Sequence, residues 1–226
     1  MAASTSRFDR WASSYEDNML QQYLYVPVHQ TALQLAVQLL PHPRRVLDVS
    51  CGTGRLLRQA RRCFPTAELA GVDLAGQMVA AASAVTPARL AVGYVQGRAE
   101  CLPFPHQVFD LIFTTLSLRH WTDPPAGIAE IGRVLTPGGV VVLADVFPSG
   151  RRSGPALPRL RRRHPVVPAE LGTALAACRM EVIGRAHTPW FQLPDVQVIA
   201  AMKATPRSGP GRKAARDVRF PGPRAT

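Results

Sequence analysis

The chain has 226 residues, of which 46% are hydrophobic and 19% charged, so it can bury the core of one domain and is not disordered throughout. Its formal net charge of +12 is concentrated in two segments. Residues 151–163 carry six arginines, and residues 205–226 carry six Arg or Lys against Asp217. The rest of the chain is nearly neutral, so a domain face that binds nucleic acid is not the first expectation.

Targeting and metal-binding patterns are absent from the sequence. No charge-free run of about 18 apolar residues occurs, and the N-terminal residues lack the apolar core of a secretory signal. We therefore expect a soluble, cytoplasmic protein with no membrane span. The cysteines are scattered, with no C-x-x-C pair and no histidine cluster beside them, which predicts reduced thiols and no metal site. They are Cys51, Cys63, Cys101 and Cys178.

Helical and extended patterns alternate along the chain. Residues 8–40 read as helical and end at Pro41-His42-Pro43, because proline cannot continue a helix. Strands are predicted at residues 45–49, 68–73, 90–96, 109–115 and 139–145, with helices at 55–62, 77–83 and 125–135, the last closed by Thr136-Pro137-Gly138-Gly139. A Pro/Arg-rich connection over 148–168 precedes a helix at 169–177 and two further β-like runs at 181–186 and 196–202.

This alternation predicts a doubly wound α/β fold with a mostly parallel, Rossmann-like sheet of about seven strands and helices on both faces. The unbroken apolar runs suit strands that are covered on both sides. Parallel strands bring their carboxyl ends to one edge of the sheet, and ligands bind at that edge. From Thr205 onward little can be buried, so disorder is expected there.

The turn after the first predicted strand is the most informative stretch. Gly52 and Gly54 carry no Cβ, so backbone N–H groups there can approach a ligand closely. Asp73 closes the next strand, 19 residues after Gly54, where a carboxylate can accept hydrogen bonds from both hydroxyls of a ribose. Together these features predict a site for an adenosine-containing cofactor.

The kind of cofactor follows from two further residues. A dinucleotide turn needs a third glycine where this chain has Leu57, so NAD is disfavoured. Asp48, just before the turn, would repel a pyrophosphate but can pair with an ammonium group. A nucleoside that carries an amino acid fits better.

With these residues, the sequence resembles the class I S-adenosylmethionine-dependent methyltransferases, in particular their small-molecule branch of the ubiquinone and menaquinone biosynthesis type. The resemblance covers residues 8–145 and extends with less support to about 203. It rests on six motifs in order: Phe8–Tyr15, Leu47–Gly54, Gly71–Leu74, Gly97–Phe104, Phe109–Ile112 and Arg133–Gly139.

The resemblance implies S-adenosyl-L-methionine as cofactor and a division of the chain into three parts. Residues 1–40 would form an N-terminal helical lid, residues 41–204 the cofactor-binding methyltransferase domain, and residues 205–226 a disordered basic tail. Tyr15, on the lid, would reach the cofactor.

The resemblance also implies a role for each matching residue. Asp48, with the backbone around Gly52 and Gly54, would hold the methionine part, Asp73 the ribose hydroxyls, and Leu74 one face of the adenine. The segment Arg98-Ala99-Glu100 would border the adenine edge, and Thr115 would close the methionine side.

Two residues of the expected site depart from the family pattern. Ser50 replaces the usual glycine of the cofactor turn. Arg98 replaces the usual acid that receives the adenine amino group, a hydrogen bond that arginine cannot accept. We therefore expect backbone groups to recognise the adenine.

His120 is the candidate general base, because it follows the fourth strand near the expected methyl position; the alternative is a packing role. We interpret the other histidines, which are His29, His42, His106, His164 and His187, as surface or structural residues.

The tetrapeptide Asp123–Ala126 is similar to the Asp-Pro-Pro-Tyr motif of nucleic-acid amino-methyltransferases. It comes too late after the strand and ends in alanine, so we interpret it as a helix start.

These observations predict methyl transfer to a small-molecule acceptor at oxygen or carbon. One alternative is an RNA, DNA or protein methyltransferase that uses the arginine-rich segments. The other is a catalytically inactive binding module that retains the fold. No motif identifies the acceptor or the oligomeric state.

Overall fold

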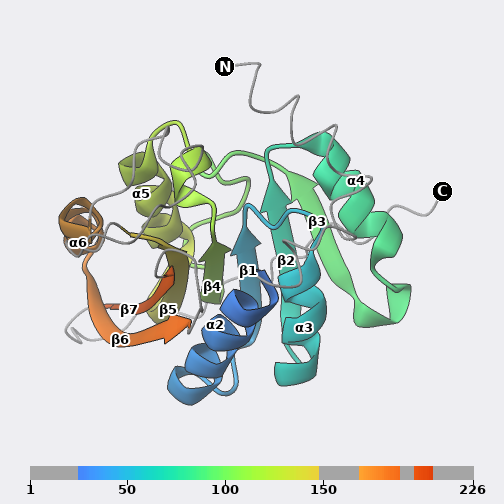
Figure 1. The fold of residues 1–226 in the computed structure, drawn as a ribbon, viewed down its shortest axis with the longest axis horizontal. Helices are drawn as coiled ribbons and strands as arrows, with labels where there is room; N and C mark the ends of the chain where they lie inside the picture. Colours follow the sequence, from blue (N-terminus) through green and yellow to red (C-terminus); the bar gives the residue numbers. More distant parts are fainter. Residues whose placement is uncertain (1–24, 148–167, 189–195, 206–226) are drawn as a thin grey trace, which may run out of the picture.

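The computed structural model describes residues 25–147, 168–188 and 196–205, and Figure 1 shows their arrangement. One sheet of seven strands runs through this part of the chain in the order β3-β2-β1-β4-β5-β7-β6. The strands are β1 (Arg45–Val49), β2 (Glu68–Asp73), β3 (Val92–Gln96), β4 (Phe109–Thr115), β5 (Leu135–Val146), β6 (Met180–Thr188) and β7 (Val196–Lys203). β1 to β5 are parallel, whereas β7 lies antiparallel between β5 and β6. The predicted seven-stranded, mostly parallel sheet is confirmed.

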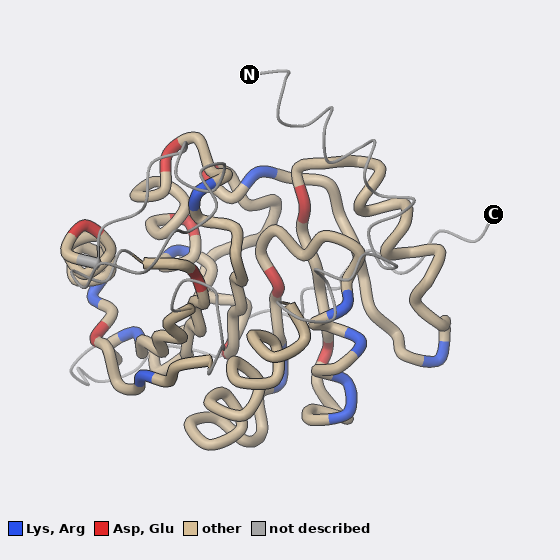
Figure 2. The backbone as a smooth tube through the Cα atoms, in the orientation of Figure 1, with Lys and Arg blue, Asp and Glu red and all other residues tan. Residues whose placement is uncertain are grey.

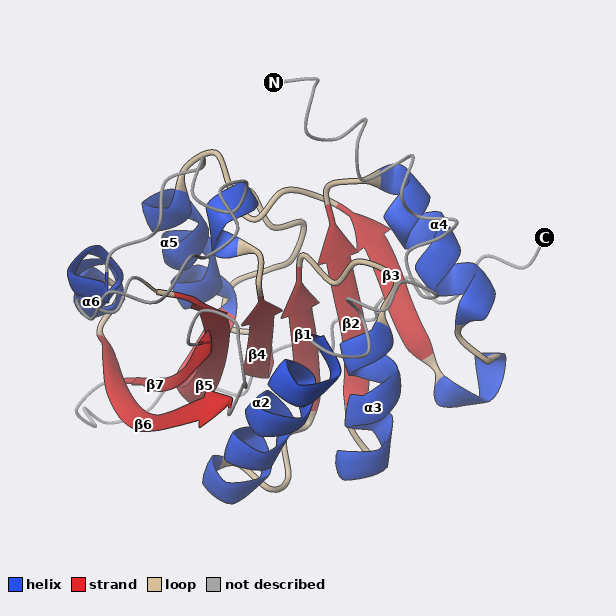
Figure 3. Cartoon of the chain, viewed as in Figure 1, coloured by secondary structure: helices blue, strands red, loops and turns tan. Residues whose placement is uncertain are grey.

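Helices cover both faces of the sheet (Figure 3). They are α2 (Val26–Leu39), α3 (Arg55–Cys63), α4 (Gly76–Val85), α5 (Pro124–Val134) and α6 (Pro168–Ala177), with short 3-10 turns η2 (Ala88–Leu90) and η3 (Leu118–His120). Alternate residues of β1 point to opposite faces, as the strand period requires. Val46 belongs to the core cluster that includes α2 and α3, while Leu47 and Val49 belong to the cluster that includes α5 and α6.

The amino-terminal helix of the described part belongs to the core. In α2, Val28, Ala32 and Ala36 are fully buried against the sheet, next to strands β5, β6 and β7. The helix ends at Leu39, just before the predicted stop at Pro41. Residues 1–24 of the expected lid, including Tyr15, lie outside the described residues.

One predicted boundary was wrong. Thr136-Pro137-Gly138-Gly139 was expected to separate α5 from the next strand, but β5 begins at Leu135, directly after the helix. The ladder explains the difference: Leu135 pairs with Phe109 and Val140 with Leu111, so residues 136–139 on β5 face a single residue of β4. The glycines therefore form a bulge within the strand, where Gly138 has a φ of 79°. The helix start predicted at Pro124 and Pro125 is confirmed, with Asp123 accepting from the N–H of Ala126 as N-cap.

Charged residues are spread along the described part of the chain (Figure 2), with a run of arginines along α3. The two basic segments noted in the sequence, 151–163 and most of 205–226, lie outside the described residues. None of the described helices is both long and apolar enough to cross a membrane. Across residues 25–147, 168–188 and 196–205, no three His, Cys, Asp or Glu side chains are grouped so that they could hold a metal ion.

Candidate active site

A pocket opens at the carboxyl edge of the parallel strands. β1 lies between β2 and β4 in the sheet, so the strand order reverses there and leaves a crevice above the strand ends. The crevice encloses about 1030 Å³ when the solvent-filled space at its mouth is included. Of the residues predicted from the sequence, its lining includes Asp48, Ser50, Gly52, Asp73, Leu74, Ala99, Glu100, Thr115 and His120.

Asp73 connects the turns after β1 and β2. The N–H of Gly52 donates to Asp73 Oδ2 (2.8 Å), and the N–H of Ala75 donates to Asp73 Oδ1 (2.9 Å). The chain crosses the end of the sheet in a left-handed conformation, with φ of 63° at Ser50, 53° at Gly52 and 75° at Gly54. One carboxylate thus fixes the turn that the sequence identified as the cofactor turn.

Gly54 lies behind this turn and outside the pocket lining. It occupies the N-cap of α3 in the left-handed conformation, and a Cβ there would overlap the ring of Tyr94 on β3. The residue therefore permits the close approach of α3 to the sheet.

We expect Gly54→Ala to lower the free energy of unfolding by about 2–4 kcal/mol, because strain at positive φ adds to overpacking. Urea denaturation monitored by circular dichroism measures this change. Gly172→Ala is the matched control, since nothing lies within 4 Å of a Cβ at this helical position. It should stabilise α6 by about 0.5–1 kcal/mol. Equal effects at both positions would contradict the role of Gly54.

Asp48 is a buried carboxylate with an unused acceptor. Asp48 is only 2% exposed, and within the described residues its Oδ1 has no hydrogen-bond partner. Burial raises the pKa of Asp48 well above its usual range, and the nearby charge of Asp73 raises it further. An ammonium group would supply both the missing donor and the compensating charge. The site therefore fits a ligand that carries an amino group next to a nucleoside.

The loop after β3 closes another side of the pocket. Glu100 accepts from the N–H groups of Thr122 (2.6 Å) and Asp123 (3.2 Å), which ties this loop to the one after β4. Arg98 pairs with Glu100 at 3.6 Å and donates to Thr122 Oγ1 (3.3 Å). Arg98 is not part of the pocket lining, so its side chain reinforces the wall from outside.

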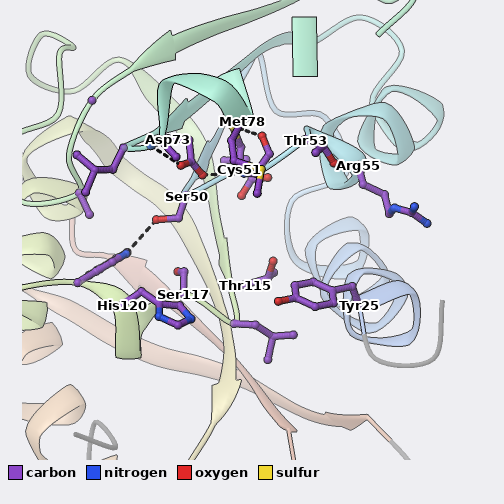
Figure 4. A pocket seen from close by; sticks show the side chains of 18 of the residues that line it. Tyr25, Ser50, Cys51, Thr53, Arg55, Asp73, Met78, Thr115, Ser117 and His120 are labelled. Carbon is purple, nitrogen blue, oxygen red and sulfur yellow. Dashed lines mark hydrogen bonds between the residues drawn. The ribbon is translucent and has the colours of Figure 1, made fainter. Parts of the chain in front are cut away.

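Several lining residues were not predicted from the sequence, and two of them lie at the start of α2. Tyr25 is the N-cap of α2 and His29 follows one helical turn later, with ring centroids 6.1 Å apart in an edge-to-face arrangement. His29 is buried, and its Nε2 is 3.3 Å from Thr115 Oγ1. Figure 4 shows Tyr25 beside Thr115, across the pocket from Ser50 and His120. The i, i+4 spacing of a tyrosine and a histidine on an apolar helix was the available signal.

His29 is expected to stay neutral down to strongly acidic pH. Burial, and secondarily the charge of Arg55, lowers its pKa from 6.5 to about 3. Because the unfolded chain takes up this proton below pH 6.5 and the folded chain does not, His29 costs stability as the pH falls, roughly 2 kcal/mol near pH 5. The ring-proton shifts of His29 in an NMR titration should therefore remain constant from about pH 8 to 5. A midpoint near 6.5 would contradict the buried position.

His120 is carried by η3, which is held against the sheet by Asp145 at the end of β5. Asp145 accepts from the N–H of Leu118 (3.0 Å) and from Arg119 Nη1 (3.1 Å). Burial raises the pKa of Asp145, and the guanidinium of Arg119 partly offsets this rise. His120 itself lies next to Ser117 at the pocket wall (Figure 4).

Comparison with known proteins agrees with this geometry. Residues 47–143 match the family model of the methyltransferase domain. Residues 47–143 therefore form a methyltransferase domain.

Two curated relatives of the chain are methyltransferases. A demethylmenaquinone methyltransferase of Deinococcus radiodurans is 37% identical over 131 residues, which cover 57% of this chain and 54% of that protein. A malonyl-[acyl-carrier protein] O-methyltransferase of Halorhodospira halophila is 33% identical over 144 residues, covering 62% and 47%. The chain thus spans about half the length of these curated relatives.

A solved structure shows the same fold. The magnesium protoporphyrin IX methyltransferase of Synechocystis PCC 6803, determined with bound SAH, superimposes with a TM-score of 0.68 at 19% identity, over 88% of this chain and 95% of the other.

Proposed function

We propose that this chain transfers the methyl group of S-adenosylmethionine to an oxygen or carbon atom of a small-molecule acceptor. The observation that carries the proposal is the buried Oδ1 of Asp48, which has no partner among the described residues, beside the carboxylate of Asp73. Two acids at the ends of β1 and β2 match the ammonium group and the ribose hydroxyls of one ligand. The named functions of the relatives support a small acceptor.

Different residues of the pocket bind different parts of S-adenosylmethionine in this proposal. When bound, S-adenosylmethionine supplies a methyl group already activated by the sulfonium charge. Asp48 pairs with the ammonium group, Asp73 accepts hydrogen bonds from the ribose hydroxyls, and Leu74 covers one face of the adenine. Because the methyl group is activated, the protein contributes mainly alignment and exclusion of water.

Proton transfer falls to His120 in this proposal. An acceptor oxygen or carbon that is protonated would have to release its proton on methylation. The imidazole of His120, which lines the pocket, accepts it. An acceptor that is already anionic needs no such base.

Binding of S-adenosylhomocysteine to the purified chain, measured by calorimetry, tests the cofactor site. We expect saturable binding with one site per chain. Lack of binding at millimolar S-adenosylhomocysteine would refute the proposed enzymatic function and favour the inactive binding module.

A screen of quinols, phenols and carrier-bound carboxylates with isotope-labelled methyl donor, read by mass spectrometry, then identifies the acceptor. Labelling of RNA, DNA or protein instead would support the alternative that uses the arginine-rich segments.

Once an acceptor is known, His120→Ala should lower kcat by about 100-fold or more, the usual contribution of a general base. The affinity for S-adenosylhomocysteine should stay unchanged, because the base acts on the acceptor. A pH profile of kcat distinguishes this from a structural effect: the acid limb of the wild-type profile should disappear in the variant. Unchanged turnover would remove His120 from the mechanism.

A further inference from the structure

Ser50 adopts an unusual backbone conformation. Its φ of 63° lies in the left-handed region, where a side chain with a Cβ costs about 1–2 kcal/mol relative to glycine. The backbone is fixed in place, because the N–H groups of Ser50 and Cys51 both donate to the carbonyl of Val72 (2.8 and 3.1 Å). A strained residue at a pocket wall needs a compensating contact.

That contact is the indole of Trp121. Its Nε1–H donates to Ser50 Oγ at 3.0 Å, a bond that glycine at position 50 could not accept. Figure 4 shows the Ser50 hydroxyl at one end of this bond, on the same side of the pocket as His120. Trp121 and Ser50 both line the pocket, although they lie 71 residues apart in the sequence.

Gly127 of α5 also constrains the position of the indole ring. A Cβ at Gly127 of α5 would overlap the six-membered ring of Trp121. The ring therefore rests on the helix backbone at one end and on the cofactor turn at the other. The backbone N–H of Trp121 donates to the carbonyl of Leu118 (3.2 Å), so the main chain of this residue is attached to η3.

We infer that Ser50 and Trp121 are positioning residues that lock the turn carrying His120 to the turn that holds the methyl donor. The inference rests on the proposed function. Asp145 and Glu100 attach the loop after β4 to β5 and to the loop after β3, respectively. The bond between Trp121 and Ser50 attaches it to the cofactor turn itself. Occupation of the donor site and the geometry around His120 are therefore coupled.

The pairing can be measured in the ligand-free chain by the exchange of indole N–H protons with solvent, observed by NMR. The chain has three tryptophans, and the signal missing in Trp121→Phe assigns Trp121. We expect the Trp121 indole proton to exchange about tenfold more slowly in the wild type than in Ser50→Ala. Equal exchange rates would overturn the inference.

Ser50→Gly separates the bond from the backbone strain. Both Ser50→Ala and Ser50→Gly lose the acceptor oxygen, but only glycine relieves the left-handed conformation. Ser50→Gly should therefore unfold at a higher temperature than Ser50→Ala while showing the same fast indole exchange. Slow exchange in Ser50→Gly would mean that another group holds the indole, and would overturn the pairing.

A double-mutant cycle tests the functional side. We expect Ser50→Gly and Trp121→Phe each to weaken S-adenosylhomocysteine binding about fivefold (about 1 kcal/mol), and the double variant no more than either alone. Additive losses, or none, would refute the coupling. If the wild type shows a protected indole but binds no S-adenosylhomocysteine, the pairing stands and the proposed function fails.

Discussion

Asp73→Ala should weaken the binding of S-adenosylhomocysteine by about 100-fold, because it removes a charged acceptor worth about 3 kcal/mol to its ligand and to the turn. The same carboxylate accepts from the N–H of Gly52 (2.8 Å) and of Ala75 (2.9 Å), so its loss also frees the cofactor turn. Calorimetric titration measures the affinity, and circular dichroism establishes that the variant is folded.

The matched control lies at the other end of the same strand. Glu68 begins β2 and pairs at the surface with Arg45 (2.9 Å), with 55% of its side chain exposed. Glu68→Ala removes an acid from β2 without touching the pocket, so it should leave the affinity unchanged. Undiminished binding by Asp73→Ala would place the cofactor site elsewhere in the chain.

Asp48→Asn should have opposite effects on stability and on binding. In the free protein it replaces a buried charge whose Oδ1 has no partner among the described residues by a neutral amide, and should raise the free energy of unfolding by about 1–3 kcal/mol. It also removes the charge that pairs with an ammonium group, so the affinity for S-adenosylhomocysteine should fall at least tenfold. A gain in stability together with a loss of affinity is expected where a residue serves ligand binding rather than folding.

The dependence on pH gives a further check of Asp48. The folded pKa lies well above the ordinary value of 3.8, so folding favours the protonated acid. The wild type therefore loses stability as the pH rises above about 4, until the raised pKa is passed, and Asp48→Asn does not lose this increment. Denaturation midpoints across this range should diverge toward neutral pH. A variant less stable than the wild type at neutral pH, or one that binds as tightly, would contradict this account.

Much of the sheet could be predicted because its signals are local. The predicted bounds of β1, β2 and β4 agree with the structure, because each strand is a short, mostly apolar run. The bulge over residues 136–139 was read as a separating turn, because proline and glycines mark both. Only the pairing of β5 with β4 distinguishes them.

The candidate site was predictable where its residues follow directly on strand ends. Asp48, Asp73 and Thr115 lie at the carboxyl ends of β1, β2 and β4, so the fold class alone brings them together. His29 could not be placed in this way, because its distance from Thr115 depends on how α2 crosses the sheet. The bond between Trp121 and Ser50 likewise depends on tertiary packing.

Helix α2 both packs in the core and borders the pocket, and this limits how the pocket can be redesigned for another acceptor. Val28 and Ala32 of α2 are fully buried against the sheet, while Tyr25 and His29 of the same helix line the cavity. A change of tilt or register that reshapes the wall must also repack the interior. Redesign of acceptor preference should therefore exchange the side chains at positions 25 and 29 singly and leave the helix backbone where it is.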